Sequence, residues 1–211
     1  MKILRLLGLG LLVLVAVMAA RTFFLLPAGA PVELKAITLD EAEVSRVATN
    51  LSKAITYKTI SWSLDQAPDL AAFSGFQDFL RITYPGVHRV MELETVSDYS
   101  LMYRWPGSAT AKRPIAFTAH MDVVPVPTYG LKDWQHPPYA GVIDEQGILW
   151  GRGAMDDKGI LISLMEAAET LIASGFTPAR DIYFLFGHDE ELGGDKGAAL
   201  MASRLKEQGV Q

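Results

Sequence analysis

Cysteine is absent from this chain of 211 residues. Disulfide bonds, thiolate metal ligands and a cysteine nucleophile are therefore all excluded. The chain also lacks a cluster of Lys and Arg, and its net charge at pH 7 is −5. Because nucleic-acid phosphates are bound by such clusters, we expect no nucleic-acid partner. Repeats and low-complexity tracts are lacking too, and a hydrophobic content of 50% is typical of a globular protein.

Acidic residues are missing from the first 32 positions, and Glu33 is the first acid. Lys2 and Arg5 precede an apolar run that extends from Leu6 to Ala20. Residues 23–26 would lengthen this run to the roughly 20 residues that a membrane span needs. The pattern of a positive flank followed by an apolar run favours a membrane-anchoring helix.

Residues 1–27 are therefore expected to form a signal anchor, and residues 28–38 a linker. A cleaved signal peptide is the first alternative, because small residues such as Ala19 and Ala20 follow the run. A buried core helix is the second alternative. With the positive flank inside, the body would lie outside the cytoplasm, anchored to the membrane in a periplasmic or extracellular position, or secreted if the leader is cleaved.

The body alternates between helical and extended patterns. Asp40 is the expected N-cap of the first helix. The expected helices cover residues 40–56, 65–80, 159–174 and 195–208. The expected strands cover residues 87–92, 99–105, 114–119 and 181–186, the last two buried, and a hairpin is expected at residues 142–150. This alternation predicts an α/β fold with a mostly parallel sheet.

The first polar cluster contains His120 and Asp122, directly after the strand expected at residues 114–119. In an extended backbone, side chains two positions apart point to the same side. An imidazole is a good zinc ligand, and a carboxylate that accepts its other N–H fixes the tautomer. A buried structural His–Asp pair explains this short pattern equally well.

The second cluster, Gly151 to Gly159, carries two adjacent acids, Asp156 and Asp157, where a helix is expected to begin. Acids at this position commonly cap a helix and offset its dipole, which is the simpler explanation for the segment alone. The functional alternative is that one Asp caps the helix while the other binds one metal with each oxygen. Such metal pairs lie roughly 3.5–4 Å apart.

The third cluster runs from Gly187 to Gly194 and holds three consecutive acids, Asp189, Glu190 and Glu191. The acids repel one another, and a nearby cation would relieve that repulsion. One Glu can then bind metal while the other takes a proton from water. A solvated acidic loop is the alternative. Because all three clusters follow expected strands, whose carboxyl ends collect ligands in α/β folds, we expect them to converge.

An H-x-D, a glycine-rich D-D and an E-E in this order resemble one family of zinc-dependent metallopeptidases. It includes carboxypeptidase S, aminoacylase-1, glutamate carboxypeptidase and succinyl-diaminopimelate desuccinylase. The resemblance starts near Asp40 and is carried by residues 120–125, 134–141, 151–159 and 187–194. The leader and the third cluster are most similar to the branch of carboxypeptidase S and the N-fatty-acyl-amino-acid synthase/hydrolase.

The resemblance implies that His120, Asp156 and Glu191 are metal ligands, with Asp156 bridging two Zn²⁺ ions. Co²⁺ or Mn²⁺ would be substitutes. Asp122 and Glu190 would be the catalytic residues. Asp122 would orient His120, and Glu190 would act as general base.

By the same resemblance, Asp157 would cap the helix or support a ligand. The implied reaction is hydrolysis of an amide bond by metal-activated water. The substrate would be a small peptide, as for a carboxypeptidase, or an N-acyl amino acid.

Members of the family add a later acidic ligand, a C-terminal His and a smaller domain for dimerisation and substrate binding. None of the four histidines of this chain follows Glu191. We therefore expect residues 39–211 to be the N-terminal part of a three-layer catalytic domain, with the lid domain and the C-terminal part absent. The fragment would have little or no activity alone, and the full-length parent would be a homodimer.

Two alternatives remain. One is a non-catalytic truncated fragment that binds at most one metal weakly. The other is a membrane-tethered binding module in which the three clusters serve only as caps and turns.

Overall fold

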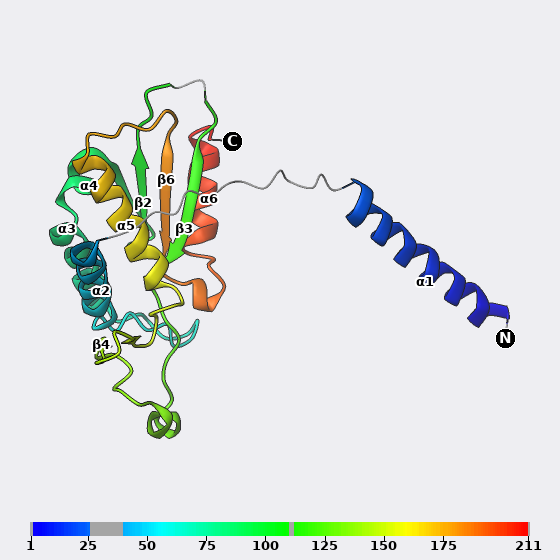
Figure 1. Ribbon diagram of the computed structural model, residues 1–211, viewed down its shortest axis with the longest axis horizontal. Coiled ribbons are helices and arrows are strands. Elements are labelled where there is room, and N and C mark those ends of the chain that lie inside the picture. The colour runs from blue at the N-terminus through cyan, green and yellow to red at the C-terminus, as the bar shows by residue number, and fades with distance from the viewer. Residues whose placement is uncertain (1, 26–39, 110–111, 211) are drawn as a thin grey trace. The chain divides into compact units, whose positions relative to one another are not determined.

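The computed structural model describes residues 2–25, 40–109 and 112–210. The chain divides into two units, residues 1–38 and residues 39–211. In the first unit, helix α1 (Lys2–Ala20) is followed by a π-helical turn, Arg21–Leu25 (Figure 1). The linker expected at residues 28–38 lies outside the described residues.

Helix formation in the leader agrees with the sequence, but the anchor function assigned to it does not gain support. Within the part of the chain that the structure describes, no helix is long and apolar enough to cross a membrane. The membrane anchor, and the membrane as a partner, are therefore unsupported.

The second unit is built on a four-stranded sheet with the strand order β1-β2-β6-β3 (Figure 1). Its strands are β1 (Glu92–Val96), β2 (Ser100–Trp105), β3 (Ile115–His120) and β6 (Ile182–Gly187). Strand β3 is parallel to β6, whereas β1 and β6 are both antiparallel to β2. The expectation of a mostly parallel sheet is thus wrong for the described residues, where the sheet is mixed.

The mixed sheet has a local cause. Residues 97–99 connect β1 to β2, and Ser97 and Asp98 have positive φ angles of 51° and 69°. A tight turn with two such residues joins antiparallel strands, whereas parallel neighbours need a long crossover. Only β3 and β6 have such a crossover, which includes helix α5 (Lys158–Ala173). The expected hairpin is also present, as β4 (Val142–Ile143) paired with β5 (Leu149–Trp150).

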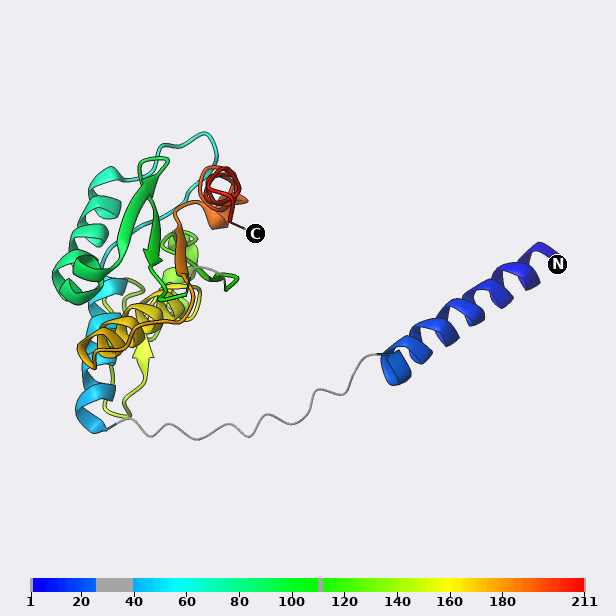
Figure 2. The same ribbon diagram turned by 90° about the horizontal axis from the view of Figure 1, so that it is seen from above.

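Helices cover both faces of the four-stranded sheet (Figures 1 and 2). One face carries α5 together with α2 (Glu41–Ile55), α3 (Leu70–Thr83) and α4 (Pro85–Val90), and α6 (Ala198–Glu207) lies on the other. Two hydrophobic cores lie on the two faces of the sheet, and successive side chains of the central strands point alternately into one and the other. Tyr103 and Phe186 belong to the core under α2–α5, whereas Met102 and Leu185 pack with Met201 of α6. An α/β fold is therefore confirmed.

Caps explain where the first helices begin. The side chain of Asp40 accepts a hydrogen bond from the Glu43 amide at 2.7 Å, and Glu43 reaches back to the Asp40 amide, so the expected N-cap is confirmed. Helix α3 begins later than expected because Asp69 caps it. The strand expected at residues 87–92 is wrong: Pro85, whose fixed φ suits a first helical turn, begins α4 there.

The edge strand β3 departs from the expectation of a buried strand. Ala119 and His120 at its end are buried, but Ile115 and Phe117 are 38% and 43% exposed. Within the described residues β3 is an edge strand that pairs only with β6, and its first four side chains are exposed to solvent. Strand β6 lies between β2 and β3 and is buried over most of its length, as expected.

Candidate metal centre

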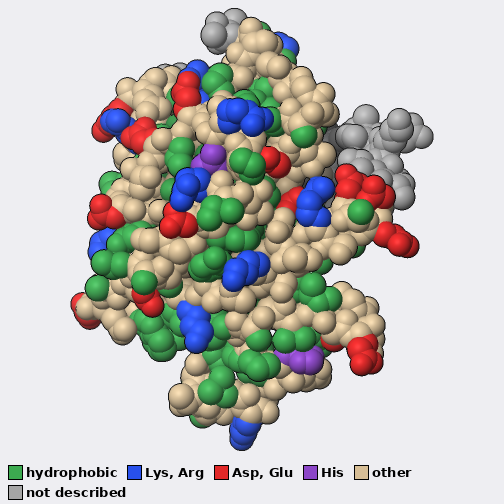
Figure 3. Space-filling view, turned by 90° about the vertical axis from the view of Figure 1, so that its left-hand side faces the viewer, with side chains coloured by type: hydrophobic (Ala, Val, Ile, Leu, Met, Phe, Trp, Pro, Cys, Tyr) green, Lys and Arg blue, Asp and Glu red, His purple; other side chains and the backbone are tan. Residues whose placement is uncertain are grey.

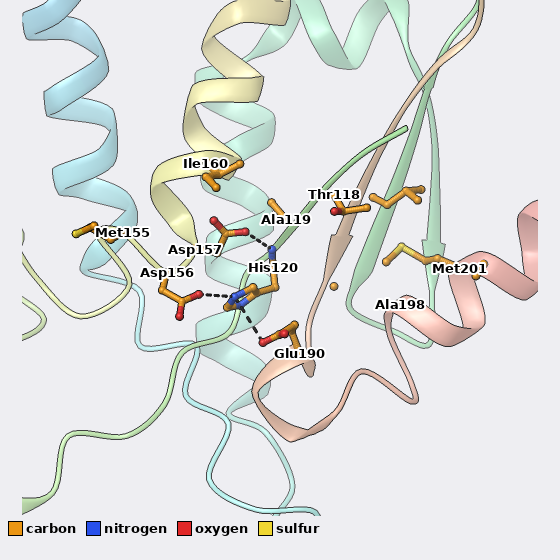
Figure 4. Close-up of a pocket in the computed structure, with 13 residues that line it drawn as sticks. Thr118, Ala119, His120, Met155, Asp156, Asp157, Ile160, Glu190, Ala198 and Met201 are labelled. Atoms are coloured by element: carbon orange, nitrogen blue, oxygen red, sulfur yellow. Dashed lines mark hydrogen bonds and ion pairs between the residues drawn. The ribbon is translucent and has the colours of Figure 1, made fainter. Parts of the chain in front are cut away.

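Parallel pairing of β3 and β6 brings the first and third clusters to the same edge of the sheet. His120 ends β3 opposite Gly187, the last residue of β6. The loops that follow therefore leave the sheet side by side. The second cluster approaches from the start of α5, and Figure 4 shows Asp156, Asp157 and Glu190 around the His120 ring. The predicted convergence of the three clusters is what the structure shows.

The three predicted metal ligands lie together. His120, Asp156 and Glu191 each offer one ligand atom, and these atoms lie within 4.8 Å of one another. His120 Nε2 is 2.9 Å from Asp156 Oδ1. The imidazole is buried, whereas the Asp156 side chain is 81% exposed. One imidazole nitrogen and two carboxylates form a donor set that suits Zn²⁺ and related divalent ions.

Glu190 lies at the rim of this cluster. Its Oε2 atom is 3.7 Å from His120 Nε2, and 60% of its side chain is exposed (Figure 4). Glu190 and Glu191 begin the short 3₁₀ helix Glu190–Leu192, which directs one carboxylate to the rim and the other into the donor cluster. The two adjacent acids thus occupy different positions around the same imidazole.

Asp122 is completely buried and makes contacts with both of its oxygens. Its Oδ1 lies 3.3 Å from His120 Nδ1 and accepts a hydrogen bond from the Glu190 amide at 3.2 Å. Its Oδ2 accepts hydrogen bonds from Ser61 Oγ at 2.7 Å and from the Glu191 amide at 3.1 Å. The carboxylate contact with His120 was expected, but the backbone carbonyl oxygen of Asp122 also lies 3.0 Å from the same Nδ1, so Asp122 supports the ring with both its side chain and its backbone. The hydrogen bonds from the backbone amides of Glu190 and Glu191 to the Asp122 carboxylate were not predicted.

The electrostatics of the site favour positive charge. Burial lowers the pKa of His120, but hydrogen bonds with Asp122 and Asp156 outweigh it and raise that pKa to about 9. Burial raises the pKa of Glu191, and the charges of Asp156 and Asp122 raise it further. Crowded carboxylates around an imidazole therefore attract a cation. Because an imidazole must be neutral to bind metal, metal binding here would release a proton.

Asp157 does not cap α5 with its side chain. It occupies the N-cap position, but its side chain makes no capping hydrogen bond. Instead, Asp157 Oδ2 accepts a hydrogen bond from the His120 amide at 3.3 Å (Figure 4). The peptide bond between Asp156 and Asp157 is cis. Of the two roles expected for Asp157, side-chain capping is wrong, and its side chain instead supports the backbone of His120.

Two buried residues at the site were missed. Ser61 contacts Asp122, and the fully buried Lys158 donates from Nζ to the carbonyl oxygens of Ala54 and Tyr57 at 3.0 and 2.6 Å. Burial lowers the pKa of Lys158 to about 7, against the attraction of Asp122. A lone serine in a loop gives no sequence signal. A lysine in the first turn of a helix usually indicates a solvated side chain.

A cavity of about 600 Å³ adjoins the cluster. Its lining includes the polar side chains of His120, Asp156 and Glu190 and the apolar side chains of Ile160 from α5 and Met201 from α6 (Figure 4). The donor cluster is therefore reachable from a concave surface rather than closed inside the fold.

The sequence motifs around the donor cluster match those of a known protein family. The sequence profile of "Peptidase family M20/M25/M40" matches residues 116–211, which confirms the family resemblance that the motifs predicted. The particular relatives come from the predicted branch. "Probable carboxypeptidase S-like 2" of Dictyostelium discoideum is 46% identical over 163 residues, which are 76% of this chain and 30% of that protein.

Other relatives agree. Carboxypeptidase S of Saccharomyces cerevisiae is 42% identical over 136 residues, 64% of this chain and 24% of that protein. The N-fatty-acyl-amino acid synthase/hydrolase of Mus musculus is 34% identical over 174 residues, 81% of this chain and 34% of that protein. The chain thus spans about a third or less of the length of these relatives.

A solved structure shares the fold. Human carnosine dipeptidase 1 superposes with a TM-score of 0.62 over 81% of this chain and 38% of its own, at 19% sequence identity. At this level of identity the likeness shows a common fold and nothing finer.

Proposed function

We propose that the protein containing this chain is a metal-dependent hydrolase of amide bonds. The observation that carries the proposal is the donor cluster of His120, Asp156 and Glu191 with Glu190 at its rim. The proposed substrate is a small peptide or an N-acyl amino acid. The names of the relatives, a carboxypeptidase and an N-fatty-acyl-amino acid synthase/hydrolase, support these two classes.

Two Zn²⁺ ions, with Co²⁺ or Mn²⁺ as substitutes, belong to the proposal. His120 would hold one ion, Glu191 the other, and the exposed Asp156 would give one oxygen to each. When bound, the metal supplies a Lewis acid that lowers the pKa of water and polarises the substrate carbonyl.

The side chains of this chain would perform the remaining steps. Glu190 would take a proton from the attacking water and return it to the leaving nitrogen, because its carboxylate is exposed beside the donor cluster. Asp122 would hold the His120 ring with Nε2 directed toward the other acids. Because water is the proposed nucleophile, the reaction needs no covalent intermediate.

The proposal extends to two properties of the chain. A catalytic zinc usually has three protein ligands of its own, whereas the two proposed ions would share three predicted donors here, so these 211 residues alone should hydrolyse little or nothing. Acidic and basic side chains are interspersed on the face shown in Figure 3, and the net charge is −5, which favours a small substrate over a nucleic acid. From the positive charge that precedes the apolar run of the leader, we also propose that the rest of the protein lies outside the cytoplasm.

The test uses the purified gene product, with whatever sequence the gene adds to these residues. Its zinc content and its hydrolysis of a dipeptide and an N-acyl amino acid are measured before and after treatment with a chelator. We expect about two zinc ions per chain, and loss of activity on chelation that added Zn²⁺ reverses. Glu190→Ala should abolish hydrolysis while zinc stays bound.

Glu145→Ala is the matched control, because Glu145 is an exposed acid in the β4–β5 turn. This variant should remain fully active. Hydrolysis that survives chelation would reject the metal mechanism, and an active Glu190→Ala variant would reject the proposed base.

A further inference from the structure

Residues 59–61 lie beside the loop that carries Asp122. Ile60 and Val123 form a parallel bridge. The Val123 amide donates to the Thr59 carbonyl, and the Ser61 amide donates to the Val123 carbonyl, both at 3.0 Å. The 59–61 segment is therefore held against the end of β3 by its backbone, about 60 residues away in the sequence.

The two hydroxyl side chains of this segment have different partners. Thr59 Oγ1 donates to the Met121 carbonyl at 2.6 Å, a contact with backbone only. Ser61 Oγ donates to the Asp122 carboxylate at 2.7 Å. Within the described residues this is the shortest contact of the Asp122 carboxylate. Ser61 is 6% exposed and Asp122 is not exposed at all. A hydrogen bond to a buried carboxylate is stronger than one between neutral groups.

The start of the segment is fixed from the metal centre itself. Lys158 follows the two acids of the second cluster, and its Nζ donates to the Tyr57 carbonyl, two residues before Thr59. The Lys158 side chain is fully buried. The position of Ser61 is thereby tied to α5 at one end and to the H-x-D loop at the other.

We propose that Ser61 is a positioning residue of the metal centre. Its hydroxyl holds the Asp122 carboxylate in the orientation that gives Oδ1 to His120 while Oδ2 accepts the Glu191 amide. Without the hydroxyl, that orientation loses its shortest contact, and the His120 ring loses part of its support. The inference rests on the proposed metal binding. Removal of a residue that supports a metal ligand typically weakens metal affinity by about 10–100-fold.

The test compares variants of the gene product by Zn²⁺ affinity, from competition with a chromophoric chelator, and by the urea midpoint of the metal-free protein. Ser61→Ala should weaken Zn²⁺ binding by about 10–100-fold. Ser61→Thr and Ser61→Val have the same shape and differ by the hydroxyl. The Thr variant should therefore bind Zn²⁺ at least tenfold more tightly than the Val variant. This pair decides the question even if Ser61→Ala fails to fold.

Two further variants separate positioning from general stability. Thr59→Val removes a hydroxyl that bonds only backbone, so it should lower the urea midpoint with a smaller loss of affinity. Ser63→Ala removes an exposed hydroxyl and should change neither property. Equal affinity in Ser61→Thr and Ser61→Val overturns the proposal. Parallel losses of affinity and stability in Thr59→Val and Ser61→Ala also overturn it.

The outcome for the hydrolase proposal is separate. If Ser61→Val loses Zn²⁺ affinity and no form of the protein hydrolyses an amide, the positioning role stands and the proposed function falls. A wild-type protein that binds no Zn²⁺ overturns both.

Discussion

The two ring nitrogens of His120 face two very different aspartates. On the Nδ1 side, Asp122 is buried and accepts hydrogen bonds from a hydroxyl and two backbone amides. On the Nε2 side, Asp156 lies at 2.9 Å with a side chain 81% exposed. A carboxylate is buried without great cost only when it is hydrogen bonded. The hydrogen bonds of Asp122 therefore contribute to the stability of the fold, whereas Asp156 remains accessible to an incoming ion.

Replacing each aspartate in turn should give the largest contrast. Asp122→Ala leaves the Ser61 hydroxyl and the amides of Glu190 and Glu191 without their acceptor, so we expect a loss of about 3 kcal/mol in the free energy of unfolding. Asp156→Ala removes an exposed side chain and should change the free energy of unfolding by less than about 0.5 kcal/mol. Urea unfolding of the gene product in the presence of a chelator measures both.

Metal affinity should fall in both variants, because one loses a ligand and the other the support of a ligand. Equal stabilities of the two metal-free variants would show that the buried and exposed sides of the ring do not differ as described.

A smaller effect is expected at Gly153, whose φ is +83° and where an added Cβ would lie 2.6 Å from Val123 Cγ1. Gly153→Ala adds a left-handed strain of about 1–2 kcal/mol and pushes on the H-x-D loop. Gly147, in the exposed hairpin turn, has φ +78° with nothing within 4 Å of an added Cβ. Gly147→Ala should therefore introduce the same backbone strain, but no steric contact with a neighbouring side chain.

The difference between the two melting temperatures therefore measures how rigid the buried side of the site is. Gly153→Ala should melt lower and bind Zn²⁺ more weakly than Gly147→Ala. Identical behaviour would mean that Val123 moves aside freely.

The smallest effect is expected at Asp181, a partly exposed carboxylate remote from the metal centre. A hydrogen bond from the Gly107 amide, together with Arg104, holds the pKa of Asp181 below its ordinary value. Its stabilising contribution is therefore present above the unfolded-state pKa of about 4 and disappears as the pH falls through the lower folded-state value.

Asp181→Asn should cost at most about 1 kcal/mol at pH 7, because the carboxylate is partly exposed and screened. The difference from wild type should shrink between about pH 5 and pH 2. Urea midpoints across this range measure it. A difference that grows toward low pH would contradict the assigned direction of the pKa shift.

The exposed side of the metal centre was predictable from sequence, whereas on the buried side Asp122 was predictable but its partner Ser61 was not. Asp156, Glu190 and Glu191 stand in runs of like charge, and such runs gain little unless a cation is near. Ser61 is separated from Asp122 by 61 positions and stands in no motif. Asp157 was predicted either to cap α5 or to support a ligand, because local patterns favour capping, and only the hydrogen bond from the His120 amide decides between the two roles.

The fold shows the same limit. Helix α2 followed from its capping residues and its hydrophobic spacing, which are local. The short run at residues 87–92 is too brief for its period to separate helix from strand, and Pro85 decided the outcome. The exposure of Ile115 and Phe117 depends on which strand lies beside β3, which no local pattern encodes.

The contacts of Asp122 also have a consequence for the order in which the protein matures. Its partners are separated from it by 61, 68 and 69 positions in the chain, on both sides. A growing chain that has already exposed Ser61 and Asp122 must still wait for Glu191 before the carboxylate is satisfied. Contacts of such long range close late because loop-closure entropy opposes them. During synthesis, the ability to bind metal should therefore appear only when the sheet has folded.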